Sequence, residues 1–549
     1  MLEYNNENLK IVSELIRKNL TPDLIAKKWR ERNSRNPTFG HCHTAAGCLY
    51  KLFGPKAMHM HRGFDGQIYH WWVVDKNGNI IDLTSEQYTS IGKVPPYEQG
   101  EKSGMLGFGY KTRVLVYQGL AKNNAAIEPP IWAAMLANSV RSKGFRPEIL
   151  DAEVEGLDYL SAAKRITEYK AKVVCFVVYG QQPSASSQNM EGATATAREL
   201  KNLEPNSFVL FVGGHVAALP VETLEKETSI DAVCQNEGVY TIQNLLKLSS
   251  FDEHNLKKID GLVFRTNDNQ ICLNPPSEIV PRSSLDVELP GMAWDLLPPL
   301  SRYRTAGWHS WTNDTEKQPF AALYTSLGCP YKCSFCMINI INRTKQGSNV
   351  SSEDSNIFRW WSPEFIIKQF DYIAEQGVKN VKIADELFVL NPRHFEAICD
   401  LIIERGYDFN IWAYSRVDTC KPKHLDKLAK AGVNWLGLGI ENPNNELRKE
   451  IHKEGFQEVR ILDLFKVIRE AGINIAGNYI FGLPFDTQES MQATLDFALE
   501  NPTEMTNMYS AMAYPGSPLH NQARLFNIDL PKTYSGYSQH SYDTLNLAS

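Results

Sequence analysis

The stretch Thr325-Ser-Leu-Gly-Cys-Pro-Tyr-Lys-Cys-Ser-Phe-Cys-Met337 gathers three cysteines into one short segment. They are Cys329, Cys333 and Cys336. A structural zinc site or a fully ligated iron–sulfur cluster uses four ligands, and neither Cys399 nor Cys420 follows at a suitable spacing. Three thiolates on a four-iron cluster leave one iron open to a small molecule. The alternative, three reduced core cysteines, is disfavoured by the glycine, proline and lysine that lie among them.

The spacing Cys-x3-Cys-x2-Cys, with Phe335 before the last cysteine, resembles the signature of the radical S-adenosylmethionine (SAM) superfamily. In that superfamily the amino and carboxylate groups of SAM chelate the open iron, and reductive cleavage gives a 5′-deoxyadenosyl radical. The resemblance implies that Cys329, Cys333 and Cys336 hold a [4Fe-4S] cluster and that Phe335 lies at the cofactor site. It also implies an electron donor such as flavodoxin or ferredoxin.

Residues 311–549 alternate strand-like and helix-like segments, which is typical of a parallel α/β barrel. Polar, glycine or charged residues follow each strand, at the end where barrel sites are built. The expected strands are 320–325, 380–384, 410–414, 435–438, 475–480 and 508–512. Six strands match the partial (β/α)6 barrel that the resemblance implies.

The resemblance also assigns SAM contacts at these strand ends. Asp385 and Glu386 correspond to the residues that hold the SAM amino group, Arg416 lies near the carboxylate, and Glu441 lies near the ribose. Gly482 belongs to the same cofactor-binding set. Carboxylates accept hydrogen bonds from ammonium and hydroxyl groups, and a guanidinium can fork onto a carboxylate. The alternative for each charged residue is an ordinary salt bridge at a strand end.

Residues 111–250 predict a doubly wound α/β sheet with strands at 114–117, 172–179, 208–212 and 231–234. Ligands of such sheets bind at the carboxyl ends of the strands. No G-x-G-x-x-G follows the first strand, so a dinucleotide is not favoured.

This unit resembles the cobalamin-binding domain that precedes many radical SAM domains. The resemblance implies a cobalamin site formed by Ser184, Ser186, Ser187, Gly213, Gly214, His215, Glu237 and Gly238. The D-x-H-x-x-G motif, which supplies a lower axial histidine in many cobalamin proteins, is absent, and residues 120–129 contain no histidine. Two alternatives remain: a flavodoxin-like domain that has lost its ligand, and a His215 that is a solvent-facing turn residue.

The first unit contains Cys42 before a helix-like run, His70 on a strand-like run, and Asp82 on the next. A helix N-terminus favours the thiolate form of a cysteine, and a histidine with an aspartate can activate and orient it. The order Cys, His, Asp, followed by Gln87, resembles the YunG-like proteins, whose fold is related to cysteine peptidases. The alternative is structural: Cys42 caps a packed helix and His70 satisfies a neighbouring backbone group.

Composition bounds the remaining possibilities. A chain of 549 residues predicts several domains, which we place at 1–110, 111–250, 251–310 (a hairpin and linker) and 311–549. A net charge of −6 without a basic run does not favour nucleic-acid binding. No apolar run approaches the roughly 20 residues needed to span a bilayer, and the first residues are unlike a secretory signal, so we expect a cytoplasmic protein. The chain ends soon after the sixth strand, which suggests a truncated C-terminus.

A cobalamin-type sheet joined to a radical SAM barrel implies a cobalamin-dependent radical SAM enzyme. We expect it to methylate an unactivated carbon of a small metabolite or peptide. The same pairing serves ring-closing and rearranging enzymes, which the sequence does not separate from methylases. Two further hypotheses are a thiol hydrolase or amide-processing protein centred on Cys42, and a non-catalytic cobalamin or iron–sulfur sensor.

Overall fold

The computed structural model describes residues 4–18, 20, 33, 36–54, 56–65, 68–98, 101–102, 126–180, 183–310, 316–345, 350–453 and 461–539. The chain divides into two compact units, Met1–Ala125 and Ala126–Ser549. The helix predicted at 22–32 and the strand predicted at 114–117 lie outside the described residues. None of the described helices is both long and apolar enough to cross a lipid bilayer.

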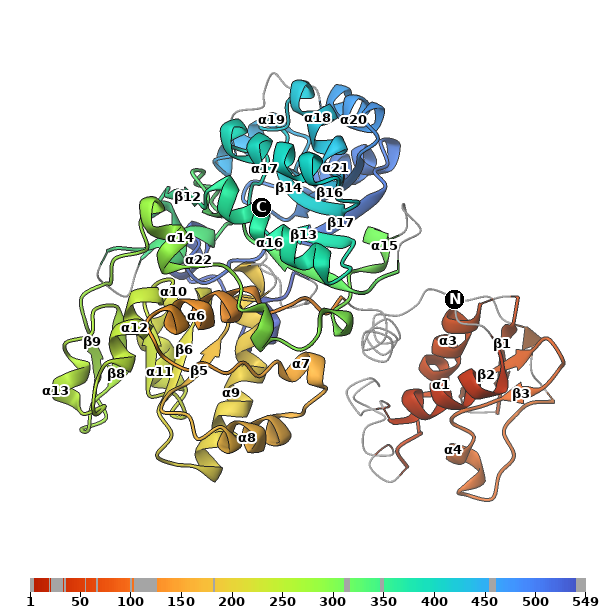
Figure 1. The fold of residues 1–549 in the computed structure, drawn as a ribbon. Coiled ribbons are helices and arrows are strands. Elements are labelled where there is room, and N and C mark those ends of the chain that lie inside the picture. The colour runs from red at the N-terminus through yellow and green to blue at the C-terminus, as the bar shows by residue number, and fades with distance from the viewer. Residues whose placement is uncertain are drawn as a thin grey trace. The chain divides into compact units, whose positions relative to one another are not determined.

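The first unit packs helices against a four-stranded sheet with the order β3-β2-β1-β4 (Figure 1). The strands are β1 (Met58–Phe64), β2 (Tyr69–Asp75), β3 (Ile80–Ile81) and β4 (Glu101–Lys102), and the helices are α1 (Asn6–Lys18), α3 (Cys42–Phe53) and α4 (Glu86–Thr89). Strands β1 and β2 pair antiparallel, with Met58 opposite Asp75 and Phe64 opposite Tyr69. Alternate residues of each strand therefore share a face.

One face of this sheet forms the core of the first unit. Val12 of α1, Leu49 of α3, and Met60 and Val73 of the sheet belong to one buried apolar cluster. Helix α3 begins at Cys42, two residues before the predicted start of the helix-like run, so the thiol lies in the first helical turn.

The second unit begins with a five-stranded sheet in the order β5-β6-β7-β8-β9. The strands are β5 (Val174–Val177), β6 (Val209–Val212), β7 (Ala232–Cys234), β8 (Leu262–Arg265) and β9 (Ile271–Leu273). The first three are parallel, as predicted, and β8 and β9 are antiparallel. The predicted hairpin at 260–273 forms, but it extends this sheet rather than lying in a separate connector.

Helices accompany this five-stranded sheet along the chain. They are α6 (Ile131–Ser142), α7 (Ala152–Glu155), α8 (Tyr159–Glu168), α9 (Ser186–Leu203), α10 (Gly214–Ala218), α11 (Pro220–Lys226), α12 (Val239–Leu246), α13 (Glu253–Leu256) and α14 (Leu285–Glu288).

The six-stranded parallel sheet predicted for the second half is confirmed, with the order β10-β13-β14-β15-β16-β17. Its strands are β10 (Phe320–Leu323), β13 (Asn380–Ile383), β14 (Asn410–Arg416), β15 (Val433–Glu441), β16 (Asn474–Phe481) and β17 (Met505–Ser510). The helices of this half, which lie around the strands in Figure 1, are α15 (Gly307–Ser310), α16 (Pro363–Glu375), α17 (Pro392–Arg405), α18 (Pro422–Lys430), α19 (Asn445–Glu450), α20 (Ile461–Glu470), α21 (Gln488–Glu500) and α22 (Pro518–Leu525).

Local sequence explains where the main barrel helices begin. Helix α16 has a proline at its first position, and the Ser362 hydroxyl accepts a hydrogen bond from the Phe365 backbone N–H. Helix α21 begins with a capping box between Thr487 and Ser490. These caps fix the strand–helix connections at the ends of the sheet.

A short antiparallel pair that the sequence did not predict carries the cysteine segment. Strand β11 (Ser326–Gly328) pairs with β12 (Phe358–Trp360) directly after β10. Gly328 has a φ of +84°, and a Cβ there would lie 2.2 Å from the Ile357 carbonyl oxygen. Only glycine fits at this position, which directs the chain from the pair into the cysteine loop.

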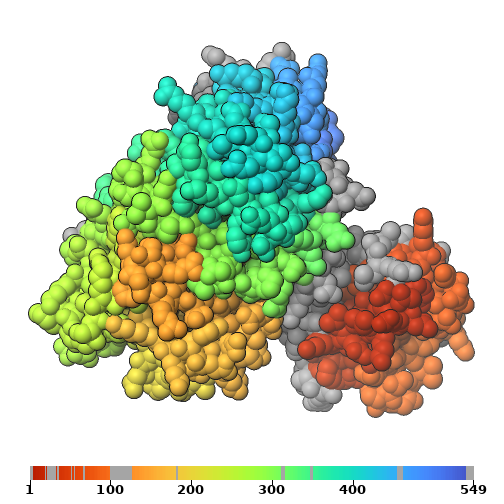
Figure 2. All heavy atoms as spheres, viewed as in Figure 1, coloured from red at the N-terminus to blue at the C-terminus, as the bar shows by residue number. Residues whose placement is uncertain are grey.

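A buried ion pair joins the five-stranded sheet to the β11–β12 pair. Glu237, after β7, lies 2.7 Å from Arg359 of β12, and both side chains are almost fully buried. The other Glu237 oxygen accepts from the Val280 backbone N–H at 2.6 Å. On the visible face of the space-filling view, the yellow, green and blue residues of the second unit lie against one another (Figure 2).

Buried histidines make the stability of the second unit depend on pH. Burial lowers the pKa of His215 to about 3 and that of three others to about 4; these three are His309, His394 and His520. An unfolded histidine has a pKa near 6.5, so between about pH 6.5 and 4 the unfolded chain binds more protons. We therefore expect the stability to fall as the pH falls through this window.

Urea denaturation at about pH 7 and about pH 5 measures this dependence. We expect a lower midpoint at the acidic pH, and a smaller decrease for His309→Gln because one depressed histidine is removed. The exposed His254 offers the control His254→Gln, which should leave the decrease unchanged. An equal decrease in wild type and His309→Gln would contradict this account.

Candidate functional site

The three cysteines of the β11–β12 region lie on one braced loop and are partly exposed. The Cys336 N–H donates to the Cys333 carbonyl at 3.0 Å. Asn339 accepts from the Cys329 N–H at 3.1 Å and donates to the Cys329 carbonyl at 2.7 Å. Backbone hydrogen bonds and the Asn339 side chain thus hold the loop in place. These bonds do not use the three thiol groups.

Burial raises the pKa of the Cys329 thiol to about 12, and it also raises the pKa of Cys333 and Cys336. Metal ligation requires thiolates, so a bound cationic cluster would have to offset this cost. Among the described residues, no group of three or more metal-ligating side chains surrounds a single ion site.

Arg416, at the end of β14, brings a positive charge to this loop. Its Nη1 lies 3.7 Å from the Cys333 sulfur, and its guanidinium carbon lies 3.7 Å from the ring centroid of Tyr331. Its Nε donates to Asp418 at 2.8 Å. The aspartate and the tyrosine orient the guanidinium, which favours thiolate at Cys333.

The two carboxylates after β13 have different surroundings. Asp385 accepts from the Thr325 N–H at 2.6 Å, the Thr325 hydroxyl at 2.5 Å and the Ser326 hydroxyl at 2.6 Å. Burial raises the pKa of Asp385 to about 6, and that of Glu386 to about 8. The Glu386 Oε2 atom is buried and has no partner within the described part of the chain. Asp385 therefore fixes the chain after β10, and Glu386 keeps acceptor capacity for a ligand.

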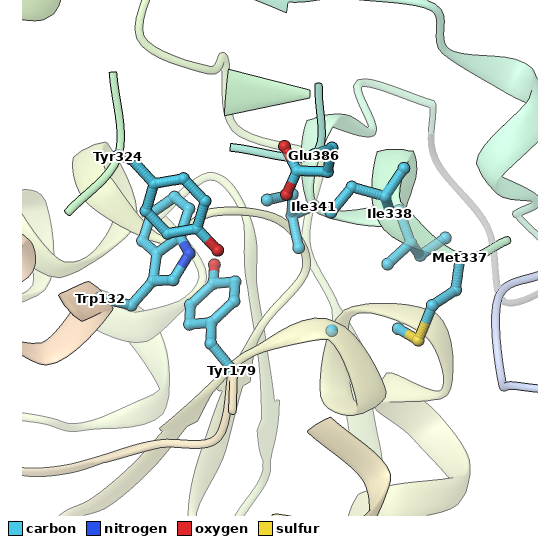
Figure 3. A pocket seen from close by; sticks show the side chains of 9 residues that line it. Trp132, Tyr179, Tyr324, Met337, Ile338, Ile341 and Glu386 are labelled. Atoms are coloured by element: carbon cyan, nitrogen blue, oxygen red, sulfur yellow. The ribbon is translucent and has the colours of Figure 1, made fainter. Parts of the chain in front are cut away.

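Glu386 lines a small pocket of about 10 Å³, room for about one water molecule, between the five-stranded and six-stranded sheets (Figure 3). Trp132 and Tyr179 form one wall, with stacked rings whose centroids lie 4.2 Å apart. Figure 3 shows the hydroxyl ends of Tyr179 and Tyr324 pointing toward each other. The remaining lining residues are Gly214, Met337, Ile338, Ile340 and Ile341.

Glycines open the backbone where β6 ends at this cavity. Gly213 has a φ of +154°, and a Cβ there would lie 2.5 Å from the Val178 carbonyl oxygen. A Cβ at Gly214 would lie 2.6 Å from the terminal carbon of Met337, the residue after Cys336. The end of β6 and the cysteine loop are therefore in van der Waals contact, and a flexible methionine side chain fills the space between them.

The predicted serine loop differs from the structure. Ser186 and Ser187 lie in the first turn of α9, fully buried, and only Ser184 precedes the helix, in a 3₁₀ turn. His215 lies in α10 and is buried, so it is not a solvent-facing turn residue. Its Nδ1 lies 2.8 Å from the Ser187 hydroxyl. The helix extends further because tertiary contacts hold both serines: the Ser186 hydroxyl donates to the Val178 carbonyl, and the Ser187 hydroxyl is paired with His215.

Several predicted cofactor residues are already engaged by protein groups. Both Glu237 oxygens are used, by Arg359 and Val280, and Gly238 takes the left-handed φ of +82° that begins α12. Glu441 forms a buried ion pair with Lys453. The Gly482 N–H donates to Asp486 at 3.0 Å, and Phe335 is partly buried against two small apolar clusters that include Ile480 and Leu519.

Sequence reasoning missed the aromatic wall and the brace of this site. Trp132 and Tyr179 were predicted only as parts of a helix and a strand, and Tyr324 only as part of the first barrel strand. The position of two of these residues in the sequence could have revealed them. Tyr179 and Tyr324 follow strands β5 and β10, at the carboxyl ends of parallel strands, where ligands bind. Nothing in the sequence marks Asn339 as the residue that braces Cys329.

The residues predicted in the first unit do come together. His70 Nε2 lies 2.6 Å from Asp82 Oδ2, Cys42 is near enough to His70 to raise the pKa of the imidazole, and the Cys42 thiol lies 3.8 Å from the Tyr69 carbonyl oxygen. This cluster lies entirely within the first unit.

Family models match three parts of the chain. The radical SAM superfamily model matches residues 323–498, the B12 binding domain model matches residues 118–246, and the YunG protein model matches residues 9–108. The first two matches contain the cysteine loop and the strand ends that face it across the cavity. The chain is a radical SAM enzyme with a B12-binding domain.

Relatives share the second unit of this enzyme. An uncharacterized methyltransferase of Pyrococcus horikoshii is 28% identical over 75% of this chain and 82% of its own length. The anaerobic magnesium-protoporphyrin IX monomethyl ester cyclase of Cereibacter sphaeroides is 22% identical, over 72% of this chain and 60% of its own length. The hopanoid C-3 methylase of Methylococcus capsulatus is 26% identical, over 71% and 67%.

Solved structures show the same fold. The radical SAM methyltransferase TsrM from Kitasatospora setae, with cobalamin and a [4Fe-4S] cluster bound, superposes with a TM-score of 0.55 at 16% identity, over 75% of this chain and 83% of that one. The cobalamin-dependent radical SAM enzyme OxsB, with aqua-cobalamin bound, gives a TM-score of 0.53 at 16% identity, over 95% and 72%. The cofactors of the enzyme are a [4Fe-4S] cluster, SAM and cobalamin.

Proposed function

We propose that the enzyme transfers a methyl group from SAM to an unactivated carbon of a small metabolite or peptide. The observation that carries the proposal is the cavity between the two sheets. Gly214 and Tyr179 come from the B12-binding half, and Met337 and Glu386 come from the radical SAM half. Met337 directly follows Cys336, the last cysteine of the loop. Residues from both halves of the second unit thus line the same small pocket.

The residues of the cavity suit three tasks. Cys329, Cys333 and Cys336 hold the cluster, with Arg416 beside Cys333 stabilising its charge. Glu386 offers its unpartnered oxygen to the ammonium of SAM. Together the bound cofactors supply methyl transfer and hydrogen abstraction, and the chain excludes water and positions the reacting groups.

Radical SAM enzymes act on small-molecule substrates and need a reductant. For this chain we propose a flavodoxin or ferredoxin as electron donor.

Methyl transfer is favoured over ring closure by the relatives. The alignment covers 82% of the Pyrococcus horikoshii protein and 60% of the cyclase. The Pyrococcus horikoshii protein is named as a methyltransferase. The cyclase relative keeps ring closure as the second candidate, because that protein aligns with 72% of this chain.

Anaerobic reconstitution with iron, sulfide and hydroxocobalamin, followed by mass spectrometry of a reduced sample with SAM, separates these candidates. We expect both 5′-deoxyadenosine and S-adenosylhomocysteine, because methylation consumes SAM in two ways. Deoxyadenosine without S-adenosylhomocysteine would favour ring closure or rearrangement. An intact cluster that gives neither product would overturn the enzyme assignment of this half and favour a sensor.

Glu386→Gln should weaken SAM binding while the cluster still assembles. The substitution keeps the shape of the side chain and removes the charge that an ammonium prefers, a difference of about 1.5–3 kcal/mol for a charged hydrogen bond. We therefore expect a Kd for SAM that is about tenfold to hundredfold higher, measured by equilibrium binding to the reconstituted protein. Glu404→Gln, on the exposed face of α17, is the matched control. Equal affinity in both variants would remove Glu386 from the SAM site.

A further inference from the structure

We propose that the first unit carries a second active site, in which Cys42 attacks the carbonyl carbon of a carboxylic amide. The site is a cysteine–histidine–aspartate arrangement that lies wholly within residues 42–87. It is separate from the cofactor cavity of the second unit and does not depend on the function proposed for that cavity.

Three elements of the first unit bring the side chains together. Cys42 is the first residue of α3, where backbone N–H groups have no intrahelical acceptor. His70 lies on β2 and is fully buried, and Asp82 directly follows β3. His70 Nε2 lies 2.6 Å from Asp82 Oδ2, and the Cys42 thiol, 3.8 Å from the carbonyl oxygen of Tyr69, is near enough to His70 to raise the pKa of the imidazole.

Hydrogen bonds fix the tautomer of His70. Asp82 also accepts from the Thr84 N–H at 2.9 Å and the Tyr97 hydroxyl at 2.8 Å. These contacts and His70 lower the pKa of Asp82 against the opposing effect of burial, so its carboxylate is an acceptor only. Nε2 of His70 therefore carries a proton whether or not the ring is charged, and Nδ1 is the nitrogen that gains or loses the second proton.

The histidine is set up to become charged. Burial opposes a charge on His70, but the interactions with Asp82 and Cys42 outweigh it and raise the His70 pKa to about 9. A histidine that serves only to pack would gain nothing from a buried carboxylate. An imidazolium beside a thiolate is the arrangement that activates a cysteine nucleophile.

Gln87 indicates the class of substrate. Its Nε2 lies 3.0 Å from His70 Nδ1 and donates to the Thr84 carbonyl at 3.1 Å. Its Oε1 is buried and has no partner within the described residues, and the side chain is only 5% exposed. A carbonyl acceptor beside His70 suits the N–H of an amide.

The proposed reaction balances within these residues and water. The Cys42 thiolate forms the sulfur–carbon bond, and the proton on His70 Nδ1 goes to the leaving nitrogen as the carbon–nitrogen bond breaks. Water then adds to the thioester carbon and gives one proton to His70 Nδ1, and the carbon–sulfur bond breaks to restore the thiolate. The products are an amine and a carboxylic acid.

The probe is 4-nitrophenyl acetate, an activated acyl donor, added anaerobically to the full chain with its iron–sulfur cluster reconstituted. Peptide mass spectrometry then locates the acetyl group. We expect Cys42 to be acetylated at least about tenfold faster than Cys48, which lies in the same helix and whose pKa burial raises to about 12. His70→Gln should slow acetylation of Cys42 by about tenfold or more.

Two Asp82 variants separate positioning from folding. Asp82→Asn keeps an oxygen that accepts from His70 Nε2–H, whereas Asp82→Ala does not, so Asp82→Asn should retain more of the acetylation rate. Cys48→Ala should leave the rate at Cys42 unchanged. Acetylation of Cys42 at the same rate in wild type and in a folded His70→Gln protein would overturn the proposal.

Discussion

Replacing Cys333 by alanine is expected to abolish cleavage of SAM, with a decrease in the 5′-deoxyadenosine rate of about a thousandfold or more. Cys333 is the cysteine beside Arg416, with 3.7 Å between the sulfur and Nη1. Without this thiolate the cluster has two ligands on the loop, and the guanidinium lies next to a methyl group. Iron and sulfide analysis and deoxyadenosine quantification measure the two consequences together.

Cys399→Ala is the matched control for this prediction. Cys399 lies in α17 of the same half and is fully buried. It is not one of the three cysteines that we propose as cluster ligands. The variant should bind iron and cleave SAM as the wild type does, apart from a small loss of stability. Wild-type deoxyadenosine production by Cys333→Ala would show that the cluster is held elsewhere.

Arg359→Met is expected to destabilise the second unit by about 3–5 kcal/mol, because it leaves the carboxylate of Glu237 buried without its cation. Glu237 and Arg359 are both almost fully buried, and Arg359 also donates to Asn342 at 2.8 Å and to the Val280 carbonyl at 2.5 Å. The double variant Glu237→Leu/Arg359→Met should recover much of the loss, since it removes both charges. Urea denaturation of the three proteins measures this cycle.

An exposed ion pair provides the comparison. Lys379 and Asp408 lie 2.8 Å apart with side chains 60% and 89% exposed, so Lys379→Met should change the stability by less than about 1 kcal/mol. If Arg359→Met and Lys379→Met changed the stability equally, the Glu237–Arg359 pair would not hold the five-stranded sheet to the β11–β12 pair. Glu237 would then be a candidate cobalamin contact again.

The parallel architecture was predictable because its strands are apolar runs that end in glycine or charged residues. The strands from Asn380 to Phe481 follow that pattern, and the helices between them begin at caps and prolines that the sequence displays. The β11–β12 pair was not predictable, because three-residue strands leave no periodicity. The hairpin at 262–273 pairs with β7 at the edge of the five-stranded sheet, and local sequence does not encode which strand edge a hairpin pairs with.

The site was predictable at the cysteines and much less so at the carboxylates. Asp385 and Glu386 are adjacent in sequence, and only the fold shows that Thr325 and Ser326 occupy the first while the second keeps an unpartnered oxygen. Glu237 illustrates the same limit: its partner Arg359 lies 122 residues away. Residue type reveals the chemistry that is possible, whereas tertiary contacts decide which groups remain free to perform it.

The central claim, that one cavity brings the cobalamin and cluster regions together, is tested most directly by electron paramagnetic resonance of the reconstituted enzyme. With cob(II)alamin bound, we expect its signal to broaden when the cluster is reduced, because Gly214 and Met337 are in contact across the cavity. The broadening should be absent in Cys333→Ala. A cob(II)alamin signal that does not change on reduction of an intact cluster would contradict the account.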